Sequence, residues 1–332
     1  LIGLHSTGLT ETKGDDLRAV AAKVDFPLVY VNTPDYDGGL ESGWALATQA
    51  MIEQLVATTE DVDDDKVVLL PHVGLTPIEV EKIKEFIAAF GYDVLALPDL
   101  STSLDGHLGE KQAALSSGGI EVEQIRALGD AGLVVSVGDS MGGCAAALQK
   151  KNPFIRHRHF DHLSGLSGTD ALAAWLLAET GRENPPDAIV RWRRRLQDAM
   201  LDGHFSLGQT RILAVGEPDH LAGLCHTLHE AGARVEFAIS TVASSQLEKI
   251  PAHRVLIGDL EDAENLGEAY DLIVGNGHCE ALAHRLHKAL VLRGFPNWEE
   301  VGNPLKHDVL YEGGAYFLCE CANAAEKFRG HG

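Results

Sequence analysis

The sequence predicts an α/β protein with multiple doubly wound parallel sheets of the Rossmann-like kind. Strand-like apolar runs and helix-like patterns alternate along nearly the whole chain, and this order is typical of parallel sheets covered by helices. The clearest strand–helix–strand unit is Val67–Leu97, and a second unit of the same kind begins at Arg211. We therefore expect two separate small α/β domains.

The N-terminal segment predicts two strands and two helices in alternation. The strands lie at Leu1–Leu4 and Leu28–Val31, and the second helix lies at about Ser42–Val56. Leu1 is not Met and already belongs to a strand-like run, so we expect further sequence upstream of it. The acidic stretch Glu60–Asp65 follows and predicts a linker.

The Val67–Leu97 unit carries clear helix boundaries. Residues Thr76–Glu79 supply an N-cap, a Pro in the first turn and a capping-box Glu, and Gly91 ends the helix. Further strands are expected at Leu133–Val137, Arg211–Gly216, Val235–Ile239, Val255–Ile257 and Leu272–Val274. Further helices are expected at about Gly168–Thr180, Pro186–Phe205, Pro218–Ala231 and Ala263–Ala269.

Composition and charge exclude several classes of partner. Apolar runs are too short for a membrane span, and the formal net charge of -22 disfavours nucleic acid and anionic membranes. The five Cys residues form no C-x-x-C pair, which argues against a disulfide framework and favours a reducing cytoplasm. Because no thiols have metal-ligand spacing, we expect no metal or cofactor to be bound by this chain alone.

A G-x-S-x-G motif surrounds Ser140, between a strand-like run and an Ala-rich helix-like run. This context is typical of a hydrolase nucleophile elbow. Asp219 and His278 each follow a strand and complete the chain order Ser, Asp, His. His72 and Gly74 suggest an oxyanion turn. These residues define an α/β-hydrolase as an alternative function.

The expected strand count argues against this hydrolase. One strand normally separates the acid loop from the His loop in that fold, whereas strands near 235, 255 and 272 lie between Asp219 and His278. Asp219 would then belong to a different domain from Ser140. The short motif is also common at ordinary strand–helix turns, so the hydrolase remains only an alternative.

A second cluster contains potential metal ligands. On a strand, His157, His159 and Asp161 would point to one face, with His162 beside them. An exposed strand edge explains the same pattern. We favour that interpretation over a metal site.

Longer stretches resemble one protein family from end to end. The matching stretches are HSTGLTETKGDDL (5–17), YVNTPDYDGGLESGWALATQAMIEQLV (30–56), PDLSTSLDGHL (98–108), RRLQDAMLDGHF (194–205) and IGDLEDAENL (257–266). They resemble the NifN family, the β-type subunits of the scaffold on which the nitrogenase iron–molybdenum cofactor is assembled. This family belongs to the nitrogenase molybdenum–iron protein superfamily, and its N-terminal segment has no counterpart in the sequence.

The resemblance implies three α/β domains of the nitrogenase component 1 type. Residues 1–62 would be the remnant of the first domain, with a C-terminal return to it at 291–332. The other implied parts are a second α/β domain at 63–165, connecting helices at 166–210 and a third α/β domain at 211–290.

The resemblance also implies a cytoplasmic scaffold subunit with no catalytic residue of its own. Such a subunit pairs with a NifE-like chain in a heterotetramer, and the nitrogenase iron protein docks on the complex. The resemblance places a 4Fe–4S cluster at the interface with the partner in the intact complex, while the cofactor precursor belongs mainly to the NifE-like chain.

Two positions separate the scaffold from the catalytic subunit. The catalytic β chain has a cluster-ligating Cys where this sequence has Gly8, and a Ser near the cluster where this sequence has Asp35. The resemblance thus places Gly8 and Asp35 near the interface cluster, although a tight turn and a helix cap explain them equally well. The implied partner-docking residues are Thr10, Glu11, Thr12 and Lys13.

A second family shares the fold that the resemblance implies. The dark-operative reductases of chlorophyll synthesis share the implied fold, but the quoted stretches fit them less well.

Because thiols are not clustered, we expect the isolated chain to bind negligible iron. We also expect uncovered apolar surface on residues 1–60 to drive self-association or partner binding.

Overall fold

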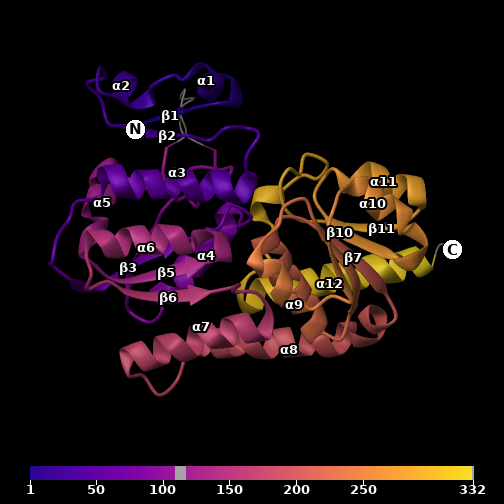
Figure 1. Cartoon of the computed structure of the whole chain (residues 1–332). Coiled ribbons are helices and arrows are strands. Elements are labelled where there is room, and N and C mark those ends of the chain that lie inside the picture. Colours follow the sequence, from indigo (N-terminus) through magenta and orange to yellow (C-terminus); the bar gives the residue numbers. More distant parts are fainter. Residues whose placement is uncertain (109–116, 331–332) are drawn as a thin grey trace.

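The computed structural model describes residues 1–108 and 117–330, which form three parallel sheets covered by helices (Figure 1). Every strand pair within these sheets is parallel. The predicted α/β class with doubly wound parallel sheets is therefore confirmed. Val135 and Val274 lie in separate sheets, as predicted, whereas the domain boundaries themselves stay a prediction.

The first layer, residues 1–56, is built on the short sheet of β1 (Ile2–His5) and β2 (Leu28–Val31). Figure 1 shows α1 (Gly8–Lys13) and α2 (Leu17–Ala21) above this sheet and α3 (Leu40–Leu55) below it. The core between the sheet and α3 is small. Its buried apolar side chains are those of Val29, Val31 and Ala50.

The second sheet has the strand order β4–β3–β5–β6. Its strands are β3 (Asp63–Leu70), β4 (Asp93–Ala96), β5 (Ala131–Val137) and β6 (Arg156–Phe160). Its helices are α4 (Pro77–Ala88), α5 (Val122–Arg126) and α6 (Gly142–Lys151). The predicted start of α4 is confirmed, because the backbone N–H of Thr76 donates to Glu79 Oε2 at 2.8 Å.

The acidic stretch predicted as a linker is partly strand. Asp63, Asp64 and Asp65 begin β3, where Asp63 pairs with Ala131 of β5. All three Asp residues are exposed, so β3 carries these charges without burying them. Acidic composition predicted a linker because it reports solvent exposure, whereas strand formation here depends on backbone pairing.

Two long helices, α7 (Gly165–Thr180) and α8 (Asp187–Gly208), connect the second sheet to the third. The C-terminal helix α12 (Leu310–Arg329) packs along them (Figure 1). At Gly314 of α12 an added Cβ would lie 3.4 Å from Cδ1 of Leu196 in α8, so α12 and α8 approach closely there. The apolar face of α12 is therefore covered by α8, while the implied return of residues 291–332 to the first domain stays a prediction.

The third sheet has the strand order β11–β10–β7–β8–β9. Its strands are β7 (Arg211–Val215), β8 (Arg234–Ser240), β9 (Arg254–Ile257), β10 (Leu272–Gly275) and β11 (Ala289–Leu292). Its helices are α9 (Pro218–Glu230), α10 (Leu260–Asn265) and α11 (Cys279–Leu286).

In the part of the chain that is described, no helix combines the length and apolar character needed to cross a membrane.

Candidate functional site

Gly8 and Asp35, predicted from the resemblance, lie in direct contact. The backbone N–H of Gly8, at the start of α1, donates to Asp35 Oδ1 at 2.9 Å. A Cβ on Gly8 would lie 2.1 Å from this oxygen and 3.0 Å from Tyr36 Cδ1. Asp35 therefore accepts one of the N–H groups that a helix start leaves free, and Gly8 leaves room for that carboxylate.

The predicted docking residues all belong to α1, beside this contact. Thr10 closes a capping box with Thr7, and Thr12 Oγ1 donates to the Gly8 carbonyl at 2.7 Å. Thr12 and Lys13 are exposed, and Thr10 and Glu11 are half-buried. The structure thus presents these side chains on one short, well-capped helix, and their contact with a partner stays a prediction.

The thiols of the described residues do not form an iron-binding group. Cys144, Cys225, Cys279 and Cys321 are buried, and Cys319 is exposed. Burial raises the pKa of the first three thiols to about 12 and raises the pKa of Cys321 as well, so they remain protonated near neutral pH. Residues 1–108 and 117–330 hold no group of three or more His, Cys, Asp or Glu suited to a metal. These residues therefore do not fit an iron–sulfur cluster by themselves.

The histidines of β6 are hydrogen-bonded to one hydroxyl group. His157 Nε2 and His159 Nδ1 lie 2.8 and 3.0 Å from Ser136 Oγ. His159 Nε2 also lies 3.2 Å from Asp161 Oδ1, and Lys249 Nζ lies 2.6 Å from the same oxygen. These contacts occupy the ring nitrogens of His159, so the cluster serves as a hydrogen-bonded strand edge.

Ser140 contacts Asp219 directly, although the two residues belong to the second and third sheets. Ser140 Oγ donates to Asp219 Oδ2 at 2.6 Å, and the backbone N–H groups of Asp139 and Ser140 donate to the same carboxylate. Ser140 and Asp219 thus follow strands of different sheets, as expected, and their side chains are nevertheless in contact. The turn after β5 faces the start of α9, and this places the hydroxyl against the carboxylate.

The hydrolase alternative is nevertheless not supported by this geometry. A Ser–His–Asp enzyme needs an imidazole between hydroxyl and carboxylate, whereas Ser140 donates to Asp219 itself. His278 lies at the start of α11, where its N–H donates to Asn276. The suggested oxyanion turn is also occupied, because the Gly74 N–H donates to His72 Nδ1 at 3.1 Å.

Glu41 of the first layer also contacts Asp219, and the sequence analysis did not identify this residue. Glu41, in the first turn of α3, accepts the Asp219 N–H on Oε1 at 2.8 Å. Its side chain is almost fully buried, at 6% exposure. Burial and the nearby charges of Asp219, Glu217 and Asp139 raise the pKa of Glu41 to about 9. The sequence signal was limited to an acidic residue in the first turn of α3, two residues after the N-cap Gly39.

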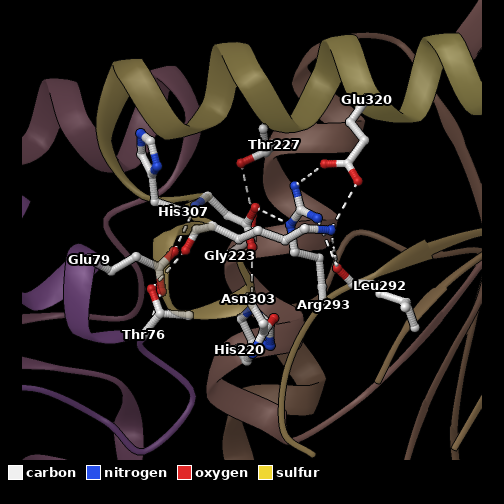
Figure 2. A network of polar contacts seen from close by, with 12 residues as sticks. Thr76, Glu79, His220, Gly223, Thr227, Leu292, Arg293, Asn303, His307 and Glu320 are labelled. Carbon is white, nitrogen blue, oxygen red and sulfur yellow. Dashed lines mark hydrogen bonds and ion pairs between the residues drawn. The ribbon is translucent and has the colours of Figure 1, made fainter. Parts of the chain in front are cut away.

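A second buried network joins α4 to the segment between β11 and α12 (Figure 2). The guanidinium of Arg293 donates to Asp308 and to Glu320, the latter at 2.6 Å. Glu79 Oε1 accepts the Asp308 N–H at 2.6 Å, and His220 Nε2 lies 3.5 Å from Asp308 Oδ2. Burial and the charge of Asp308 raise the pKa of Glu79 to about 7. We call this network and the Glu41–Asp219–Ser140 contacts together the junction.

Comparison with known proteins identifies the relatives of this arrangement. Residues 1–326 match the family model described as nitrogenase component 1 type oxidoreductase. The nitrogenase iron-molybdenum cofactor biosynthesis protein NifN of Rippkaea orientalis is 36% identical over 353 residues, which cover 97% of this chain and 75% of the relative. The protein of the same name from Bradyrhizobium diazoefficiens is 36% identical over 336 residues, covering 97% of this chain and 71% of the relative.

More distant comparisons agree with these. NifN of Klebsiella pneumoniae is 32% identical over 345 residues, covering 99% of this chain and 74% of the relative. The solved structure titled "Nitrogenase Cp1 at pH 6.5" superposes with a TM-score of 0.91 at 25% identity, covering 98% of this chain and 75% of that chain. The similarity to these proteins, in sequence and in fold, therefore covers nearly the whole chain.

Proposed function

The chain belongs to the family of nitrogenase component 1 type oxidoreductases, and from that premise we propose that it is a subunit of the scaffold on which the nitrogenase iron–molybdenum cofactor is assembled. The resemblance to the NifN family is confirmed by the relatives, each named for biosynthesis of this cofactor. The subunit pairs with a NifE-like chain, and the complex docks the nitrogenase iron protein.

The observation that carries the pairing is the apolar surface of the first layer. Leu9, Phe26 and Tyr36 are 66%, 57% and 71% exposed, although their side chains are among the largest apolar ones. The other exposed large apolar side chains of this layer are Leu1, Ile2, Val20, Val24, Leu40 and Leu46. Large apolar side chains exposed in this number on one layer are typical of surfaces that another protein covers.

Gly8 and Asp35 belong to the same layer and are proposed to face the 4Fe–4S cluster at the interface with the partner. Gly8 has no side chain that could bind iron, and its backbone N–H and carbonyl are already hydrogen-bonded to Asp35 and Thr12. Thiolate ligands would therefore come from outside the described residues, and this chain would supply one wall of the site. The α1 residues Thr10 to Lys13 would contact the docked iron protein.

Co-purification with a NifE-like chain under anaerobic conditions, followed by iron analysis, tests the pairing. We expect Phe26→Asp to abolish co-purification and the associated iron, because it places a charge in the apolar surface. Phe205→Asp is the matched control, since Phe205 is 77% exposed on α8, outside the first layer. Equal recovery of the partner with both variants would contradict pairing through the first layer.

A further inference from the structure

A cavity of about 330 Å³ lies where the start of α3, the turn at Ser140 and the loop after β8 meet. Gly38, Gly39 and Glu41 line one side, Ser140 lines another, and Val242–Ser244 line a third. A Cβ on Gly39 would lie 2.9 Å from Val242 Cγ1, so this glycine allows the two walls to approach. The cavity is therefore built from three parts of the chain that are distant in sequence.

Glu41, Gln49 and Ser140 offer acceptor atoms in this cavity, Glu41 once it has lost its proton. Ser140 Oγ uses its proton on Asp219, which leaves its lone pairs free to accept. Gln49 Nε2 donates to Glu53 at 2.8 Å, so its amide oxygen remains as an acceptor. Glu41 uses Oε1 for the Asp219 N–H, and no described residue donates a hydrogen bond to its other oxygen.

Charge and apolar lining restrict the ligand further. No Lys or Arg is among the lining residues, while Asp139, Glu217 and Asp219 surround the carboxyl group of Glu41. An anion would be repelled by these groups, whereas a cation that donates hydrogen bonds is attracted. The lining also includes Ala45, Leu46 and Val242, which suit a short hydrocarbon group.

We propose that this cavity binds a small primary amine in its ammonium form. The ammonium group donates to Glu41 and Ser140, and the alkyl group lies against Leu46 and Val242. The scaffold role does not require such a ligand, so the proposal is independent of that role. No covalent bond forms or breaks, and the only transfer is a proton from Glu41 to the buffer.

The protonation state of Glu41 supplies a specific signature of binding. The carboxyl group is protonated near neutral pH, because burial and neighbouring carboxylates raise its pKa to about 9. A bound ammonium group favours the carboxylate and lowers this pKa. Binding should therefore release close to one proton per amine, a readout that a merely structural role of Glu41 would not produce.

Calorimetric titration of the full chain with n-butylamine hydrochloride tests the proposal. Titrations near pH 7.5 in phosphate and in MOPS, which differ in protonation enthalpy, measure the protons released. We expect one binding site and proton release close to one. Glu41→Gln keeps an oxygen for the Asp219 N–H but should bind at least about tenfold more weakly and release no proton. Glu183→Gln, which changes an exposed carboxylate, should bind as the unchanged chain does.

Each other outcome has a defined meaning. Absence of binding by a folded chain, or unchanged affinity and proton release in Glu41→Gln, would overturn the proposal. Binding of acetate or displacement of the amine by Mn²⁺ would identify an anion or metal site instead. Equal affinity for ammonium chloride would refute the role of Leu46 and Val242. Should Glu41→Gln fail to fold, Ser140→Ala provides the same comparison, with weaker binding expected.

Discussion

The first layer and the junction differ in what covers their side chains. In the first layer, large apolar side chains such as Leu9 and Phe26 face solvent. At the junction, ionisable side chains such as Glu41 and Arg293 are buried and hydrogen-bonded within the chain. The junction is therefore completed by this chain itself, whereas the first layer presents a surface suited to another molecule. Mutations in the two regions should accordingly have different consequences.

Loss of Arg293 should produce the largest effect on stability. Arg293→Met leaves Asp308 without its guanidinium partner in a buried site, whereas Glu320 keeps its contact with Lys306, and breaking a buried pair typically costs about 3–5 kcal/mol. Urea unfolding measures this change. Arg285→Met is the matched control, since Arg285 pairs with Glu264 at the surface and should leave the unfolding midpoint unchanged. Equal shifts of the unfolding midpoint in both variants would show that the buried pair stabilises the fold no more than the surface pair does.

Gly8→Ala should have an intermediate and local effect. The new Cβ displaces the Asp35 carboxylate, so the Gly8 N–H loses a hydrogen bond worth about 1 kcal/mol. Hydrogen exchange of the α1 amides should accelerate, while exchange in the second sheet stays unchanged. In an Asp35→Ala background, Gly8→Ala should add little, because the displaced group is already absent. Additive effects would contradict this coupling.

Because the pKa of Glu41 is raised, its contribution to the unfolding free energy should fall as the pH rises. Glu41 has a folded-state pKa of about 9, above its ordinary value of 4.5, so its contribution is greatest at low pH and is lost as the pH rises toward 9. Glu41→Gln removes this loss. The melting temperature of this variant relative to the unchanged chain should therefore increase between pH 5 and pH 9. A constant difference would show that Glu41 is not buried as a protonated group.

The smallest effect on stability is expected in the first layer. Phe26→Asp changes an exposed side chain, so the unfolding free energy should shift by less than about 0.5 kcal/mol. Self-association of the isolated chain, measured by light scattering, should nevertheless fall, because the apolar surface is interrupted. A monodisperse isolated chain before mutation would refute this expectation.

The sequence predicted most strands and helices because their signals are local. The capping residues Thr76 and Glu79 marked the start of α4, and apolar runs marked β5 and β7. The family resemblance singled out Gly8 and Asp35 separately, and their mutual hydrogen bond was seen only in the structure. Local patterns could not reveal the contacts of Glu41 with Asp219, because these depend on how separate sheets pack together.

The carboxylates of Glu41 and Asp219 each accept backbone N–H groups at the start of a helical segment elsewhere in the chain. Without its distant carboxylate, such a helix start would be satisfied only by water. Docking of α3 therefore completes the start of α9, and docking of α9 completes the turn at Asp139–Met141 that precedes α6. Folding should consequently be one cooperative event that waits for contacts between distant parts of the chain, and rates should be limited by that docking. During synthesis, the turn at Asp139–Met141 should remain loosely ordered until α9 has formed.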